Sequence, residues 1–136
     1  MKLVGEALDQ VRRSEQKTQP ILRNSRILWL KNRVNLSQNE ETRFTPLSEM
    51  NLKTARAYRM KEALKKVWDC PDIETANILF NDWYFWATHS RLEPFTKLAK
   101  SLKKHKRIAK NPKIFLMLNL VLITSERYFR SSIENR

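Results

Sequence analysis

The chain has 136 residues, a formal net charge of +13 and 41% hydrophobic residues, a combination that indicates one folded and strongly basic domain. Such a charge favours a polyanionic partner, either nucleic acid or an acidic membrane surface, although it indicates no reaction. Gly5 is the only glycine, which argues against phosphate-binding loops, dinucleotide folds and hairpins, because these need residues that tolerate positive φ.

The N-terminal segment has the periodicity of an amphipathic helix. Val4, Ala7, Leu8 and Val11 recur at i, i+3, i+4 and i+7, which predicts a helix from the N-terminus to about residue 18. Residues 21–32 are apolar in clusters without a clean period. That segment is therefore compatible with a short helix or with an extended packing segment.

Two further helices are predicted before Pro71. Ser37 and Glu40 have the Ser-x-x-Glu spacing of a capping box, which predicts a short helix that stops before Pro46. Residues 52–68 are predicted to form a longer helix with an apolar stripe and a basic remaining surface. The apolar positions are Ala57, Met60, Leu64, Val67 and Trp68, and the basic ones are Arg56, Arg59, Lys61, Lys65 and Lys66.

The most distinct predicted helix opens after Pro71. Asp72 is its expected N-cap, and Glu74 lies in the first turn, where a carboxylate is favourable. One stripe of this helix holds Ile73, Ala76, Leu79, Phe80, Trp83, Trp86 and Ala87. Together with Tyr84 and Phe85, its aromatic residues could stack nucleic-acid bases. Periodic aromatic side chains on a helix are more often core, however, and we favour the core.

The last predicted helix is basic on one side and apolar on the other. Pro94 suits its first turn, where the missing N–H costs no hydrogen bond. The apolar side consists of Phe95, Leu98, Ala99 and Leu102. On the opposite side, no Asp or Glu lies between Glu93 and Glu126.

This cationic side suits contact with several phosphates. It predicts nucleic-acid binding that depends steeply on salt and involves no sequence-specific readout. The plain alternative is a solvated polar face, but like charges at this density repel one another without a counter-surface. The predicted DNA-binding residues are Arg91, Lys97, Lys100, Lys103, Lys104, Lys106, Arg107 and Lys110, with Arg26 and the Arg56, Arg59 and Lys61 face as further phosphate contacts.

No motif for catalysis or metal binding accompanies the basic surface. His89 and His105 lie sixteen residues apart and Cys70 lies farther away, which fits no zinc spacing, so both histidines are expected at the surface. Acids such as Glu40 and Asp72 stand at helix starts, where capping explains them. We therefore expect no catalytic residue, no metal ligand and no cofactor.

Membrane and targeting signals are lacking. Cys70 is the only cysteine, which excludes an intramolecular disulfide, and residues 1–6 lack the apolar core of a signal peptide. The one apolar run, residues 114–123, would rise about 15 Å as a helix, against about 30 Å for a hydrocarbon core. We expect a cytoplasmic protein without a membrane span.

Several short motifs occur along the chain in a characteristic order. They are Leu8-Asp9-Gln10-Val11-Arg12-Arg13, Ser25-Arg26, Leu30-Lys31-Asn32, Asn35-Leu36-Ser37, Ala55-Arg56-Ala57-Tyr58, Lys61-Glu62, Trp68-Asp69 and Ser90-Arg91-Leu92-Glu93-Pro94-Phe95. In this order, over about residues 2–105, they resemble the helical region of bacterial insertion-sequence transposases of the DDE type, specifically the IS-L-three family. The resemblance implies an origin in DNA transposition.

The resemblance also implies a parent enzyme with an RNase H-like domain, in which three carboxylates hold two divalent metal ions for strand cleavage and transfer. Its second acid, in an Asp-Arg-Phe-His type motif, would lie just before Met1. Its third, in a Glu-Gly-x-Asn type motif, would follow His105, and Glu126 and Glu134 lack that motif. We therefore expect a truncated transposase-like chain that is not an enzyme on its own.

The likeness ends near His105, where the composition changes abruptly. We expect residues 107–136 to be a divergent basic and apolar tail, and one hypothesis is that it is read in a shifted frame. If that tail was instead selected for packing, residues 114–123 form a last buried helix.

The predicted fold is an all-α bundle of four to six helices over residues 1–106, corresponding to the helical insertion between the second and third catalytic acids of the parent. The expected partner is DNA, and self-association stays open. The competing interpretation is an independent basic helical module that binds nucleic acid or protein. A membrane-surface protein is a third.

Overall fold

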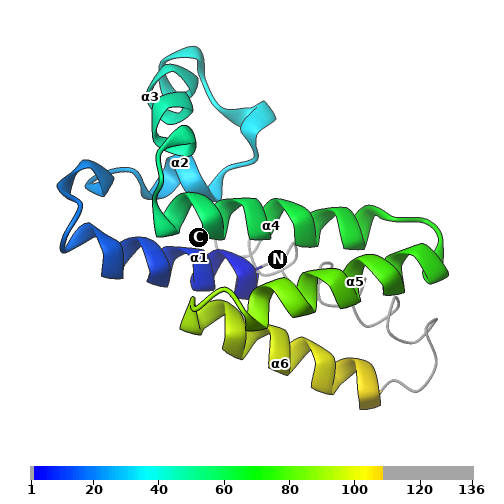
Figure 1. The fold of residues 1–136 in the computed structure, drawn as a ribbon. Helices are drawn as coiled ribbons and strands as arrows, with labels where there is room; N and C mark the ends of the chain where they lie inside the picture. Colours follow the sequence, from blue (N-terminus) through cyan, green and yellow to red (C-terminus); the bar gives the residue numbers. More distant parts are fainter. Residues whose placement is uncertain (1, 109–136) are drawn as a thin grey trace, which may run out of the picture.

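Four long helices build the body of the structure: α1 (Lys2–Gln16), α4 (Lys53–Asp69), α5 (Ile73–Thr88) and α6 (Glu93–Ile108). The computed structural model describes residues 2–108, with side chains over residues 3–104. Helices α4 and α6 each pack against both α1 and α5, so the four helices enclose one core (Figure 1).

Shorter elements connect α1 to α4: η1 (Pro20–Leu22), α2 (Arg26–Leu30), η2 (Arg33–Asn35) and α3 (Gln38–Glu49). α2 packs on α1, and α3 contacts both α2 and α4. In Figure 1, α3 stands across the first half of α4. The described residues thus contain six α-helices and no strand, which confirms the predicted all-α bundle.

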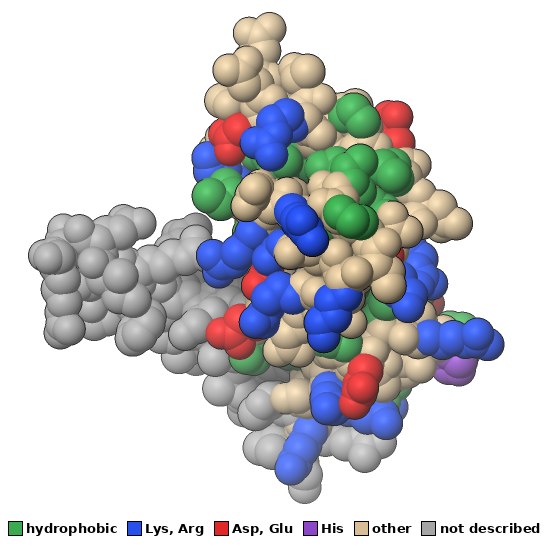
Figure 2. All heavy atoms as spheres, turned by 90° about the vertical axis from the view of Figure 1, so that its left-hand side faces the viewer, with side chains coloured by type: hydrophobic (Ala, Val, Ile, Leu, Met, Phe, Trp, Pro, Cys, Tyr) green, Lys and Arg blue, Asp and Glu red, His purple; other side chains and the backbone are tan. Residues whose placement is uncertain are grey.

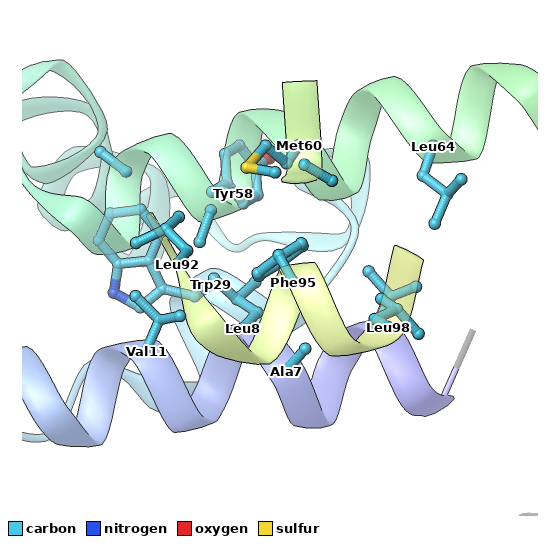
Figure 3. Packing of buried hydrophobic residues seen from close by; sticks show 14 of the residues in the cluster. Ala7, Leu8, Val11, Trp29, Tyr58, Met60, Leu64, Leu92, Phe95 and Leu98 are labelled. Atoms are coloured by element: carbon cyan, nitrogen blue, oxygen red, sulfur yellow. The ribbon is translucent and has the colours of Figure 1, made fainter. Parts of the chain in front are cut away.

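The core forms where the predicted apolar faces of α1 and α6 meet α4. The predicted apolar residues of α1 are all buried, as are those of α6. Figure 3 shows Leu8 of α1, Phe95 of α6 and Met60 of α4 pointing into the same interior, and each of the three is fully buried. Burying one such side chain stabilises the fold by about 1.5–3 kcal/mol.

The segment without a clean period is organised around Trp29. The ring of Trp29 meets Phe44 edge-on at 5.1 Å and Tyr58 at 5.8 Å between centroids, so that α2, α3 and α4 share one aromatic cluster. Its indole Nε1 donates to the Ser25 hydroxyl at 3.1 Å, and that hydroxyl donates to the Leu22 carbonyl at 2.6 Å. The alternative of a short helix is therefore the one that forms, over Arg26–Leu30.

Helix α3 begins as predicted and ends later than predicted. The Ser37 hydroxyl accepts from the Glu40 N–H at 3.2 Å while the Glu40 carboxylate accepts from the Ser37 N–H at 3.0 Å, which confirms the capping box. The predicted stop before Pro46 is wrong, because the helix continues to Glu49. Pro46 and Thr42 are both exposed, so water can bond the Thr42 carbonyl that proline leaves without a donor.

Helix α5 confirms the core assignment for part of its aromatic stripe. Phe80 and Trp83 are buried, and the Trp83 indole donates to the Met60 carbonyl at 2.9 Å, which ties α5 to α4. The prediction was wrong at Leu79 and Trp86, which are 37% and 38% exposed, and Phe85 is 64% exposed. The buried residues of α5 are Ala76, Phe80, Trp83 and Ala87, at i, i+4, i+7 and i+11, which is a narrower stripe than the predicted one.

Two acids fix helix starts in different ways. Asp72 is the N-cap of α5, as predicted, and accepts from the N–H groups of Glu74 and Thr75. At the start of α4 the N-cap residue is Leu52, which has no side-chain acceptor. The carboxylate of Glu15, on α1, takes that role by accepting from the N–H groups of Lys53 and Thr54 at 2.7 and 2.9 Å.

None of the helices in the described part of the chain has the length and hydropathy needed to cross a membrane. The predicted tail, residues 107–136, lies outside the described residues except for the last backbone turn of α6, and its alternatives stay predictions.

Candidate nucleic-acid-binding surface

Helix α6 presents its charges because its apolar side is anchored. The helix begins at Glu93 with Pro94 in its first turn, as predicted. Its four apolar residues are buried against α1 and α5. The side chains between those positions must therefore turn outward.

Three lysines form the exposed part of this surface. Lys97, Lys100 and Lys104 are exposed and lie at i, i+3 and i+7, which places them on one side of the helix over about 10 Å. Lys97 Nζ lies 3.1 Å from Glu93 Oε1, and the two side chains are 76% and 77% exposed. A pair this exposed contributes little to stability, so Lys97 can exchange its partner for a phosphate at small cost.

Lys103 points away from this row. It is half-buried, and its ammonium lies 4.4 Å from the centre of the Tyr84 ring on α5, a cation–π contact. The contact ties the outer side of α6 to α5. Lys103 is thus already engaged, whereas Lys100 and Lys104 are open to solvent.

The remaining residues predicted on this surface fall at or beyond the end of α6. Lys106 and Arg107 belong to its last turn, but their side chains lie outside the described residues, as does Lys110 altogether. These three assignments stay predictions.

Arg91 lies apart from the lysine row, in the connection between α5 and α6. It is exposed and has a φ of 61°, an uncommon conformation for a residue with a side chain. Lys53, at the start of α4, lines the same surface groove as Arg91. Lys53 is absent from the predicted site residues, because no spacing within the chain links it to Arg91.

Lys61 does not belong to a phosphate-contacting surface. It is 6% exposed, and its Nζ donates to the carbonyls of Trp29 at 3.0 Å and Leu30 at 3.1 Å, at the C-terminal end of α2. Burial lowers the pKa of this amine. The assignment of Lys61 to a basic face is wrong. The spacing already indicated burial, because position 61 lies four residues after Ala57 and three before Leu64, on the apolar side of the helix.

The other secondary candidates are mixed. Arg59 is exposed and Arg56 is half-buried, so their predicted phosphate contact stays a prediction. Arg26 is 63% exposed at its side chain, and its Nε lies 3.5 Å from Asp9 Oδ2. Arg12 and Arg13 also bond Asp9, so Arg26 shares one carboxylate with two other arginines.

Several of the described acids have structural roles. Glu40 belongs to the capping box and also pairs with Lys31 at 3.1 Å, and the Ser37 N–H is the main cause of its lowered pKa. Glu41 pairs with Arg33 at 2.7 Å. Among residues 3–104, no three His, Cys, Asp or Glu side chains come close enough together to hold a metal ion.

His89 and Cys70 both lie among the described side chains. His89 is exposed, as predicted, and its ring stacks on Phe85 with 4.0 Å between centroids. Cys70 is a free thiol, half-buried, whose Sγ donates to the Asp72 carbonyl at 3.5 Å. The side chain of His105 lies outside the described residues.

Comparisons with known proteins agree on one class. A family model described as a transposase, that of the IS-L-three type of DDE transposases, matches residues 1–111. The chain is similar to the transposase for insertion sequence element IS1001 of Bordetella parapertussis, at 29% identity over 105 residues. This alignment covers 72% of the chain and 26% of the relative, so the chain spans about a quarter of the relative's length. No solved structure matches the chain.

Proposed function

The chain belongs to the IS-L-three family of DDE transposases, and we propose that it serves DNA transposition as a DNA-contacting helical domain. Its contact is made through phosphates by the exposed lysines of α6. The observation that carries the proposal is the row of Lys97, Lys100 and Lys104 on one side of an anchored helix.

The density of this row suits a nucleic-acid backbone. Duplex DNA carries one negative charge per about 1.7 Å of its axis, so a helix side of about 10 Å faces several phosphates. Lysine offers a compact charge on a flexible stem, which follows the backbone without reading bases. The expected binding therefore depends on salt and tolerates any sequence.

The domain is proposed to contribute binding and no strand chemistry of its own. Three of its described carboxylates, those of Glu15, Glu40 and Asp72, accept hydrogen bonds from backbone N–H groups at helix starts, which is a structural role. Within residues 3–104, no cluster of His, Cys, Asp or Glu fits the two divalent metals that the family resemblance implies, and no step of the proposal involves a metal.

The localisation and the partner class follow from the same proposal. A DNA-contacting transposase domain acts where the genome lies, in the bacterial cytoplasm. Its partner is duplex DNA, and the similar protein's name, a transposase for an insertion sequence element, supports that partner.

Fluorescence anisotropy with a labelled duplex, measured over a salt series, tests the proposal. The wild-type chain should bind at low salt, and the triple variant K97A/K100A/K104A should bind at least tenfold more weakly with a shallower salt dependence.

The matched control is R43A/K65A/K66A, which removes the same charge from α3 and the far end of α4. It should stay close to wild type. The proposal fails if the wild-type chain does not bind at low salt, or if the control loses as much affinity as the α6 variant.

A further inference from the structure

A groove separate from the α6 lysine row lies at one end of the bundle. It is bounded by the second half of α1, the start of α4 and the connection from α5 to α6, and its volume is about 700 Å³. Figure 2 views the molecule from this end, and blue Lys and Arg side chains predominate over red carboxylates across the middle of the face. Lys53 and Arg91 both line the groove.

The backbone around Arg91 is held in place. The buried Ser90 hydroxyl donates to the Ala87 carbonyl at 2.7 Å and accepts from the Leu92 N–H at 3.2 Å, which bridges the turn on both sides of Arg91. These bonds hold Arg91 at a φ of 61°. Uncommon backbone conformations persist when their surroundings determine them, and they occur often at binding sites. The turn therefore presents this guanidinium at a defined place on the groove.

The lining of the groove contains two cations, Lys53 and Arg91, and two carboxylates, Glu15 and Glu93. Glu15 accepts hydrogen bonds from the start of α4, including one from the Thr54 hydroxyl at 2.8 Å, and Glu93 lies 3.1 Å from Lys97 in an exposed pair. Within residues 3–104, no carboxylate lies within ion-pair distance of the side chain of Lys53 or Arg91. These two cations are therefore available to an anion from outside.

Neutral donors complete the lining. Gln10, Ser14 and Gln19 lie along the α1 side of the groove, where they add amide and hydroxyl groups to the two cations. A set of Arg, Lys, Ser and Gln is the set that proteins use for phosphate and sugar oxygens of DNA.

We propose that this groove seats the phosphodiester backbone of duplex DNA, as a second contact site in addition to the lysine row of α6. The inference rests on the proposed function and extends it, because the domain then grips DNA at two places. Arg91 provides the fixed contact and Lys53 the flexible one.

The test is anisotropy with the same duplex, comparing wild type with K53A/R91G. Glycine is chosen because it adopts the positive φ of Arg91 without strain, so the turn is kept while the charge is removed. The double variant should bind about tenfold or more weakly and lower the salt slope by about two. R91K, which keeps the charge, should retain most of the affinity.

The control R43A/K66A removes two charges elsewhere and should bind as wild type does. Thermal unfolding of K53A/R91G tests whether the variant keeps the fold. If K53A/R91G binds as tightly as the control while K97A/K100A/K104A loses binding, the groove is not a DNA site and the proposed function still stands. If wild type fails to bind at low salt, both proposals fall.

Discussion

Glu15 and Thr54 join α1 to α4 through a helix cap supplied from another helix. One carboxylate oxygen of Glu15 accepts from the Thr54 N–H at 2.9 Å and from the Thr54 hydroxyl at 2.8 Å, although the two residues are 39 positions apart. The other oxygen accepts from the Lys53 N–H at 2.7 Å. The carboxylate also lies at the positive end of the α4 dipole, which adds to its stabilising effect.

Replacing Glu15 by alanine should therefore destabilise the fold. We expect a loss of about 1–2 kcal/mol in the free energy of unfolding, the usual effect of removing a helix cap. Urea denaturation followed by circular dichroism measures it. Glu6→Ala, at an exposed position on the same helix, is the control and should change little. Equal losses of unfolding free energy in both variants would contradict a stabilising cap from Glu15.

Lys61→Met should destabilise the fold more than expected for the exposed basic position that the sequence predicted. Methionine fills a similar volume but leaves the Trp29 and Leu30 carbonyls without their donor, so we expect a loss of about 2 kcal/mol or more. Lys66→Met on the exposed side of α4 is the matched control. Chemical denaturation of the two variants compares them, and a neutral effect at Lys61 would contradict the structure.

The Trp83 indole should contribute through its hydrogen bond as well as its volume. Trp83→Phe removes the donor to the Met60 carbonyl and leaves some space in the core, so we expect a loss of about 1–3 kcal/mol. Trp86→Phe, at a residue 38% exposed, should cost clearly less. Thermal unfolding of the pair provides the comparison, and a larger effect at Trp86 would reverse the assignment of the two faces of α5.

Asp72 should make stability depend on pH in the acid range. Two hydrogen bonds from Thr75 lower the pKa of Asp72 in the folded state. The bond from the Thr75 side chain has the larger effect, and the bond from its backbone N–H has the smaller one. A lowered folded pKa stabilises the fold above the unfolded pKa, and that contribution is lost as the pH falls through the folded value.

Wild type should therefore melt at a higher temperature than Asp72→Ala at neutral pH, and the difference should disappear in strong acid. Melting curves of both proteins from pH 7 downward test this. Asn81→Ala, at an exposed and non-ionisable position of the same helix, is the control and should show no comparable convergence. A difference between wild type and Asp72→Ala that persists unchanged in acid would rule out the cap as its source.

Lys100 and Lys103 should differ in DNA binding although both were predicted on one surface. Lys100 is exposed, while the Lys103 ammonium already lies over the Tyr84 ring. Lys100→Ala should weaken binding more than Lys103→Ala, because Lys103 must give up its aromatic contact to reach a phosphate. Anisotropy at one low salt concentration separates them. The reverse order would place the contacted side of α6 toward α5.

Local spacing predicted most of the fold. The apolar repeats of α1 and α6, the Ser37 capping box and the Asp72 cap depend on residues within a few positions of one another, and each is confirmed. The family resemblance was readable for the same reason, since it rests on short motifs in order. The rule that a proline ends a helix failed at Pro46. The hydrogen bond that Pro46 cannot donate to the Thr42 carbonyl is lost on the exposed side of α3, where water can replace it.

What the sequence determined by itself was therefore the four long helices, most of their apolar faces, the family and the excess of positive charge. Only the tertiary structure decided which charges are free. Lys61 is buried against the C-terminal end of α2, where it donates to the Trp29 carbonyl. Glu15 caps a helix 39 residues further along the chain, and Lys53 and Arg91 line one groove. Such pairings depend on how helices far apart in the chain pack together, and the spacing of residues within one helix carries no record of that packing.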